Sequence, residues 1–104
     1  ASREDDVINT AGHLVSPFEI ESVLAEHPSV AEVAVTGIPD EIMGEKVKAV
    51  IVLKEGFEQS STLEMEYRSW IRKRVSPFAV PQVIAFASEM PKTESGKIIR
   101  KLLK

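Results

Sequence analysis

The pattern of apolar and polar residues along the chain first indicates strands. Short runs rich in valine and isoleucine alternate with residues that are typical of turns. The runs predicted as strands are 30–38, 47–53 and 83–86. Near the start of the chain, two shorter runs lie on either side of Gly12, which can adopt the unusual backbone angles of a tight turn. We therefore expect a β-hairpin over residues 7–15.

Helices are predicted where apolar residues recur three and four positions apart. Ser16 can cap a helix that starts at Pro17, and Glu19 has the spacing of a capping box. A second helix is expected after a Thr62 cap, and a third over 97–103. Strands and helices intermix in a chain of 104 residues. This order predicts one α+β domain, in which a small three-stranded sheet packs with helices and carries the N-terminal β-hairpin.

Composition and charge narrow the function only slightly. The chain has no cysteine, which excludes disulfides and thiolate metal sites and fits a reducing, cytoplasmic setting. Its apolar runs are too short for a membrane span, and its two histidines are too isolated to predict a metal site. The net charge is −3, yet residues 92–104 carry five basic residues and one acidic residue. A basic end on an acidic body indicates an anionic ligand there, although a solvated helix face has the same composition.

The loop 91–97 is the most specific candidate for chemistry. Gly96 leaves the backbone open to a ligand, and Lys97 lies at the start of the predicted helix, where free amides add partial positive charge. A lysine there can stabilise negative charge that develops on phosphate or carboxylate oxygens. Taken alone, Ser-Gly-Lys is more typical of a solvated turn. Because the sequence shows neither a nucleophile–base set nor a complete P-loop, we do not expect a self-contained hydrolase or kinase.

Several motifs, in order along the chain, carry a resemblance to one protein family. They are Arg3-Glu4-Asp5-Asp6-Val7-Ile8-Asn9, Gly12, Glu19-Ile20-Glu21, His27-Pro28-Ser29-Val30, Pro39-Asp40, Gly44-Glu45 and Pro91-Lys92-Thr93-Glu94-Ser95-Gly96-Lys97-Ile98-Ile99-Arg100. Together they resemble the C-terminal domain of the acyl-adenylate-forming superfamily, which includes acyl-CoA synthetases, luciferases and the adenylation domains of peptide synthetases. The resemblance covers nearly all of the chain, and residues 95–103 are most similar to acetyl-CoA and short- or medium-chain acyl-CoA synthetases.

The resemblance implies that residues 1–104 form the mobile C-terminal domain of an AMP-forming acyl-CoA synthetase. Such a ligase joins acetate or another short- or medium-chain carboxylic acid to CoA, with ATP as the second substrate, and releases AMP and pyrophosphate. Its Mg²⁺ accompanies ATP and is bound mainly by a large N-terminal domain, which this sequence lacks. The implied partner is therefore the enzyme's own N-terminal domain, the fragment alone is expected to be inactive, and the implied setting is cytoplasmic fatty acid metabolism.

The resemblance also implies roles for individual residues. Lys97 matches the lysine that steadies charge during adenylation, and an acetyltransferase and deacetylase can regulate that lysine. Asp5 matches the hinge, within a linker at 1–6, about which the domain rotates before thioester formation. Arg3 matches a basic residue close to the nucleotide. After the rotation, the hairpin tip borders the pantetheine arm of CoA; the residues concerned are Ala11, Gly12 and His13.

Two positions depart from the family pattern and leave alternatives open. Ser2 replaces a glycine that usually precedes the hinge arginine, and Leu14 replaces a basic residue found in many acetyl-CoA synthetases. The second departure leaves the acceptor open between CoA and the pantetheine arm of a carrier protein. A third hypothesis is a freestanding module that holds an anion through its basic end. We expect no nucleic-acid partner, because no aromatic residues interleave with the basic ones to stack on bases.

Overall fold

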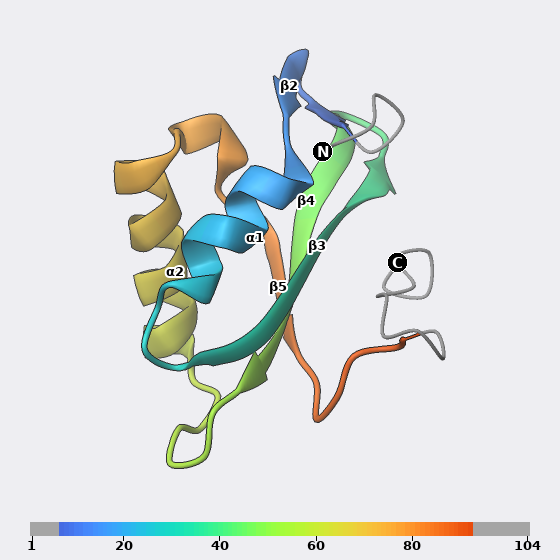
Figure 1. Cartoon of the computed structure of the whole chain (residues 1–104). Coiled ribbons are helices and arrows are strands. Elements are labelled where there is room, and N and C mark those ends of the chain that lie inside the picture. Colours follow the sequence, from blue (N-terminus) through green and yellow to red (C-terminus); the bar gives the residue numbers. More distant parts are fainter. Residues whose placement is uncertain (1–6, 93–104) are drawn as a thin grey trace.

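A five-stranded sheet organises residues 7–92, the part of the chain that the computed structural model describes (Figure 1). The strands are β1 (Ile8–Thr10), β2 (His13–Val15), β3 (Val30–Asp40), β4 (Gly44–Leu53) and β5 (Val83–Phe86). The helices are α1 (Pro17–Ala25), α2 (Ser61–Arg74) and the short 3₁₀-helix η2 (Pro77–Ala79). The predicted α+β class and N-terminal hairpin are confirmed, and the hairpin is part of the main sheet.

Strand β4 lies at the centre of the sheet and is paired on both edges. One edge pairs with the antiparallel strand β3 from Val30 to Asp40. The other edge pairs first with β1, at Gly44, and then with the parallel strand β5, from Lys48 to Ile51. A parallel neighbour requires a crossover, which α2 and η2 supply here. The result is a mixed sheet in the order β2-β1-β4-β3, with β5 beside β4.

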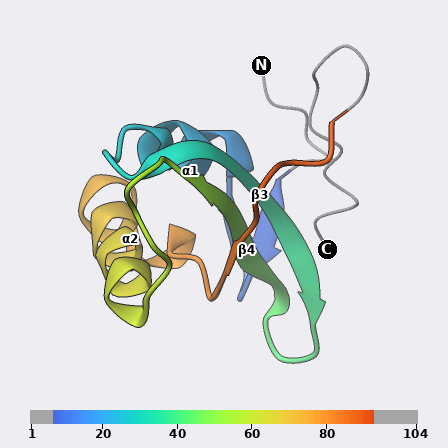
Figure 2. The same ribbon diagram turned by 90° about the horizontal axis from the view of Figure 1, so that it is seen from below.

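Both long helices pack on the same face of the sheet, as Figures 1 and 2 show. Their apolar stripes meet the inward-facing side chains of the strands in one continuous core. Each large apolar side chain buried in this way contributes roughly 1.5–3 kcal/mol relative to its exposed state. Fully buried members of the core are Ile20, Leu24, Val35, Ile51, Tyr67 and Ile71.

The first helix begins as predicted, but the second does not. Ser16 caps α1, its Oγ accepting the N–H of Glu19, and Pro17 is the first helical residue. The predicted Thr62 cap of α2 is wrong, because the cap is Ser60, whose backbone is extended and whose Oγ accepts the N–H of Leu63 at 3.0 Å. Three successive hydroxyl residues begin this helix, and sequence spacing alone does not choose among them.

Strands β3 and β4 are longer than predicted, so that residues expected in a loop are paired. Pro39 pairs with Glu45, and Asp40 pairs with Gly44. Proline is tolerated at this position because β3 is an edge strand in the described sheet, where one side of the backbone needs no partner. The predicted bounds of β5, in contrast, are confirmed at both ends.

A buried polar cluster joins the end of α1, the start of β3 and α2. The Ser29 N–H donates to His27 Nδ1 at 3.1 Å, so the other ring nitrogen, Nε2, carries the proton and donates to Glu66. Ser29 Oγ lies 2.9 Å from His27 Nδ1 and 2.6 Å from the Tyr67 hydroxyl. Burial raises the pKa of Tyr67, which keeps this hydroxyl protonated as the donor at the end of the chain of hydrogen bonds.

This cluster contains a serine, a histidine and a carboxylate, but its geometry is that of a structural link. Ser29 has no exposed surface, so its hydroxyl cannot reach a substrate. His27 Nδ1 also accepts the Ser29 backbone N–H, so the ring nitrogen is shared between this amide and the Ser29 hydroxyl.

We predict that Ser29→Ala destabilises the domain more than Tyr67→Phe does. Tyr67→Phe removes one buried hydrogen bond, worth about 1 kcal/mol, and leaves Ser29 Oγ bonded to His27. Ser29→Ala leaves the Tyr67 hydroxyl buried without this partner, which costs about 1–3 kcal/mol. Denaturant unfolding of both variants and the double variant measures the difference, and the double variant should cost less than the sum of the two. An equal or larger cost for Tyr67→Phe would contradict the proposed direction of the hydrogen bonds.

Candidate functional site

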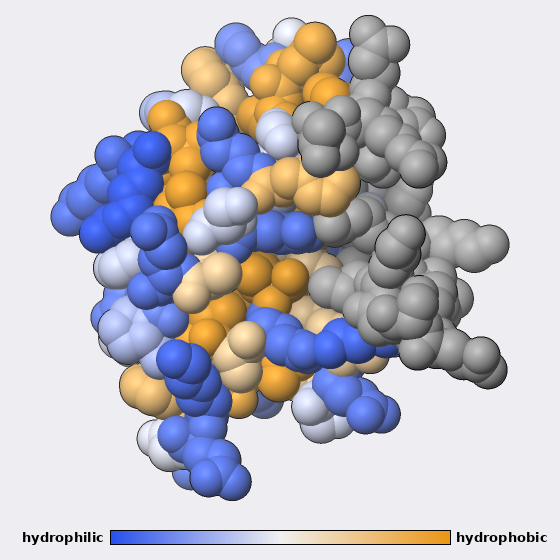
Figure 3. Space-filling model, in the orientation of Figure 1, coloured by the Kyte–Doolittle hydropathy of each residue, from blue (hydrophilic) through white to orange (hydrophobic). Residues whose placement is uncertain are grey.

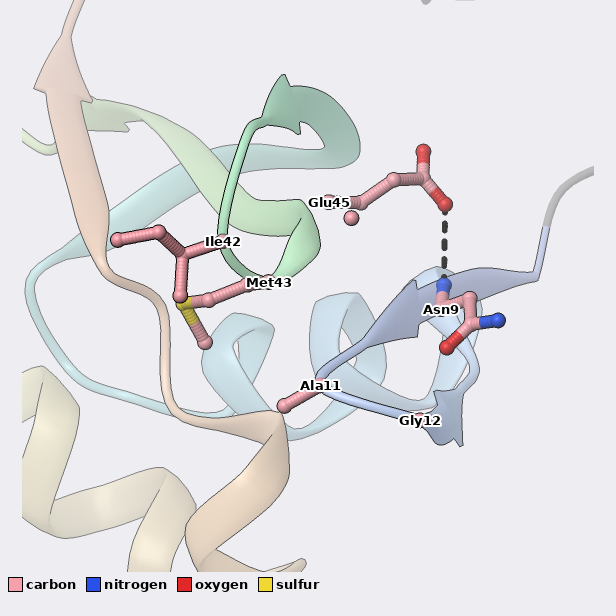
Figure 4. A pocket seen from close by; sticks show the side chains of 7 residues that line it. Asn9, Ala11, Gly12, Ile42, Met43 and Glu45 are labelled. Atoms are coloured by element: carbon pink, nitrogen blue, oxygen red, sulfur yellow. Dashed lines mark hydrogen bonds between the residues drawn. The ribbon is translucent and has the colours of Figure 1, made fainter.

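The described part of the candidate site lies where the β1–β2 hairpin tip meets the turn between β3 and β4. The Ala11 N–H donates to the Met43 carbonyl at 2.7 Å, and Thr10 pairs with Gly44. Between the two loops is an open hollow of about 680 Å³ (Figure 4). Its lining residues are Asn9, Ala11, Gly12, Ile42, Met43, Gly44 and Glu45.

The hairpin tip holds two consecutive residues in a left-handed backbone conformation. Ala11 has φ 53° and Gly12 has φ 84°, the combination that a two-residue type I′ turn requires. Glycine adopts it freely, whereas for alanine it costs roughly 1–2 kcal/mol. The turn was predicted from Gly12, whereas the left-handed conformation of Ala11 was not predicted. A Cβ at Gly12 would meet nothing within 4 Å, so the tip is open on that side.

The structure separates the three hairpin residues that the sequence grouped together. Ala11 and Gly12 line the hollow, but the His13 ring stacks on Phe78 of η2, with 3.5 Å between ring centroids and 18° between planes. Leu14, which departs from the family pattern, is 72% exposed. Exposed apolar surface is visible at the hairpin end of the face drawn in Figure 3. Apolar side chains are therefore exposed at this end of the domain.

A carboxylate closes one side of the hollow and ties the hairpin to the sheet. Glu45 Oε1 accepts the backbone N–H of Asn9 at 3.0 Å, as the dashed line in Figure 4 shows. The other carboxylate oxygen lies over Gly37, where an added Cβ would be only 2.5 Å away. A side chain at position 37 would therefore require the Glu45 carboxylate to move away from Asn9.

Asp40 organises the turn that forms the opposite wall. Its Oδ2 accepts the N–H groups of Ile42 at 3.1 Å and Met43 at 2.8 Å, and its Oδ1 lies 3.3 Å from Lys46 Nζ. The Met43 amide, together with Lys46 and the Ile42 amide, lowers the pKa of Asp40 below its ordinary value of 3.8. The turn so held presents Ile42, which is 94% exposed.

Ile42 and Met43 line the hollow but were not predicted from the sequence, and neither was the contact of Phe78 with His13. A detectable signal existed for Ile42, because a bulky apolar residue directly after Asp40 and Glu41 is unusual in a turn of otherwise polar character. Phe78 could not have been found, because its contact with His13 joins residues far apart in the chain.

The other predicted site residues, Arg3, Asp5 and Lys97, lie outside the described residues, and so do the linker at 1–6 and the helix at 97–103. Within 7–92, no three His, Cys, Asp or Glu side chains gather closely enough to hold a metal ion. Neither helix in that range is long and apolar enough to cross a bilayer.

We predict that the stabilising effect of Asp40 depends on pH. Because the pKa of Asp40 is lower in the folded state, the carboxylate stabilises the fold fully above pH 3.8, and this contribution is lost as the pH falls through the lower folded value. Asp40→Ala should therefore be less stable than the parent at neutral pH and equally stable in stronger acid. Denaturant unfolding over a series of pH values tests this, and a difference that does not change with pH would count against it.

We also predict that Gly37→Ala destabilises the domain through Glu45. The added methyl group displaces the Glu45 carboxylate and removes its hydrogen bond from Asn9, at a cost of about 0.5–1.5 kcal/mol, and hydrogen exchange at the Asn9 amide should speed up. In a Glu45→Ala background the clash disappears, so the second substitution should cost much less. If Gly37→Ala were equally costly in both backgrounds, its effect would come from elsewhere, such as the nearby Ile8 side chain.

Residues 19–97 match the family described as the AMP-binding enzyme C-terminal domain. Acetyl-coenzyme A synthetase from Bacillus subtilis (strain 168) is 50% identical over 98% of this chain, which spans 18% of that protein. The 4-hydroxybutyrate–CoA ligase 1 of Metallosphaera sedula is 52% identical over 94% of this chain, which spans 17% of the ligase. The chain thus spans less than a fifth of the length of these relatives.

Solved structures show the same similarity. A crystal structure of an acyl-CoA synthetase from Brucella canis matches 99% of this chain, with a TM-score of 0.94 and 46% identity, over 19% of its own length. The amide bond synthetase McbA from Marinactinospora thermotolerans also matches 99% of the chain, over 20% of its own length, with a TM-score of 0.89 and 30% identity. The chain therefore belongs to the family of AMP-binding enzyme C-terminal domains.

Proposed function

We propose that this chain is the C-terminal domain of an ATP-dependent acyl-CoA synthetase that forms an acyl-adenylate intermediate. The observation that carries the proposal is the 50% identity to an acetyl-coenzyme A synthetase across nearly the whole chain. Because the chain spans 18% of that relative, the acid and ATP are bound mainly by the remaining part of the enzyme. The domain then contributes one residue to the first half-reaction and a surface to the second.

In the first half-reaction, a carboxylate oxygen attacks the α-phosphorus of ATP, and the bond to the leaving pyrophosphate breaks. Negative charge on the phosphate oxygens and the attacking carboxylate must be stabilised, and Mg²⁺ that accompanies ATP supplies part of that stabilisation. Lys97 supplies the rest as a point charge. The family match, which extends to residue 97, supports this role. Acetylation of Lys97 would remove the same charge and switch off this step.

In the second half-reaction, the CoA thiol attacks the acyl carbonyl and AMP leaves. We propose that the domain first rotates about Asp5, with Arg3 near the nucleotide, so that the hairpin faces the pantetheine arm. The hollow beside Ala11 and Gly12 supports this role, because pantetheine is an extended, uncharged chain of amides and methylenes. An open backbone at Gly12 and the exposed apolar side chain of Ile42 provide matching surface.

The acceptor is best taken as CoA, with a carrier protein as the second candidate. The relatives quoted above are named as coenzyme A synthetases and CoA ligases, which favours CoA. Two observations support the carrier protein as the second candidate. Leu14 is exposed where many acetyl-CoA synthetases have a basic residue, and the chain is also similar to an amide bond synthetase. Rates of product formation with free CoA and with a phosphopantetheine-bearing carrier protein, measured side by side, distinguish the two.

We predict that Lys97→Ala in the full-length enzyme abolishes one half-reaction and spares the other. ATP–pyrophosphate exchange, tested first with acetate, should fall by about 10²–10³-fold, because a charge that stabilises the transition state is lost. Thioester formation from supplied acyl-adenylate should remain within a few-fold of the parent rate. Persistence of exchange would make Lys97 an ordinary surface lysine, and loss of both half-reactions in a folded variant would contradict the separation of roles.

The matched variant for the second half-reaction is Ala11→Trp. Ala11 already carries a side chain in the left-handed conformation, so the substitution fills the hollow while adding less backbone strain than a change at Gly12. Thioester formation should fall and ATP–pyrophosphate exchange should persist, the reverse of Lys97→Ala.

A further inference from the structure

The segment after β5 returns across the face of the sheet that α1 and α2 leave uncovered (Figure 1). Met90 is only 5% exposed and belongs to a small apolar cluster with Ala34 of β3 and Val50 of β4. Two residues later, Lys92 Nζ forms an ion pair with Glu32 Oε1 of β3. Both contacts hold the segment against the sheet, and the second joins residues 60 positions apart in the sequence.

The two residues that make these contacts on the segment are two positions apart, and so are their partners Glu32 and Ala34 on β3. Glu32 and Ala34 are two residues apart on a strand and so point to the same face, opposite to the core residues Val33 and Val35. Met90 and Lys92 are also two residues apart. Between them, Pro91 restricts its own φ and disfavours the helical conformation for the residue before it. The segment is thus locally stiff, and the two side-chain contacts hold it on this face of the sheet together with a backbone bridge at Lys92.

We infer that Glu32 is a positioning residue for adenylation: through Lys92, it orients the segment that delivers Lys97. The inference rests on the proposed function of Lys97. Lys97 follows Lys92 by five residues, a span of at most ~18 Å even when fully extended. The place at which Lys92 is held therefore limits where Lys97 can lie, and small misplacements of a reacting group reduce the rate of a step that depends on geometry.

The size of the effect follows from the exposure of the pair. Each of the two side chains is 37% exposed, so water and salt partly screen their attraction. Loss of such a pair should lower the adenylation rate by about two- to fivefold. The thioester step should not change, because in the proposed mechanism Lys97 takes no part in it.

The experiment uses the full-length enzyme with Glu32→Gln, Lys92→Gln and the charge-exchanged double variant Glu32→Lys/Lys92→Glu. Acetate-dependent ATP–pyrophosphate exchange and thioester formation from supplied acetyl-adenylate are measured separately. We expect both single variants to lower kcat for exchange about two- to fivefold with thioester formation unchanged, and the double variant to recover the rate. High salt should reduce the difference between parent and Glu32→Gln.

The matched control is Glu64→Gln, which removes a comparably exposed ion pair with Arg68 on α2 and should leave both half-reactions unchanged. Equal loss in both half-reactions, or no recovery in the charge-exchanged variant, would overturn the positioning role. Lys97→Ala in the same assay separates the two ideas. If it abolishes exchange while Glu32→Gln does not affect it, only the positioning role is refuted, whereas normal exchange in Lys97→Ala refutes the proposed function itself.

Discussion

The pairing of β4 on both edges is the interaction on which the rest of the described structure depends. The long antiparallel ladder with β3 creates the platform for the core, and the parallel pairing with β5 forces α2 to cross over the same face as α1. The first residue of β4, Gly44, also pairs with Thr10 and so attaches the hairpin. Gly44 ends the β3–β4 turn with φ 84°, a left-handed conformation that favours glycine. A Cβ at this position would lie 3.4 Å from the carbonyl oxygen of Asn9. One strand thus sets the positions of the core, the crossover and the hairpin tip.

Local features of the fold could be predicted from the sequence, because their causes lie within a few residues. The Ser16–Pro17 start of α1 and the bounds of β5 are examples. The cap of α2 was predicted wrongly at Thr62, because three neighbouring hydroxyl residues are equivalent as caps in the sequence. Only the path of the chain into α2 selects Ser60. The hairpin was predicted from Gly12, but the strain at Ala11 was not, because nothing in an alanine's local sequence signals a left-handed conformation.

Contacts between distant residues could not be predicted, and they form most of the described candidate site. In the site, Glu45 reaches Asn9 across 36 residues, and in the buried polar cluster His27 reaches Glu66 across 39. Neither pair has a sequence spacing that indicates contact, because strand pairing and the α2 crossover bring them together. The same reasoning applies to the stacking of His13 on Phe78. The order of the motifs along the chain indicated the hairpin as part of the site. The residues that form the walls of its hollow could be identified only from the folded structure.

The hairpin and the segment after β5 are attached to the sheet by different kinds of interaction. The hairpin is held by backbone hydrogen bonds at Thr10 and Ala11 and by the carboxylate of Glu45. The segment at 88–92 is held by the buried side chain of Met90, by the half-exposed ion pair of Lys92 and by a single backbone bridge at Lys92. Regions with few buried contacts open at lower free energy than regions within a ladder. For the proposed cycle of two half-reactions, we therefore expect the hairpin to stay attached to the sheet more firmly than the segment at 88–92 does.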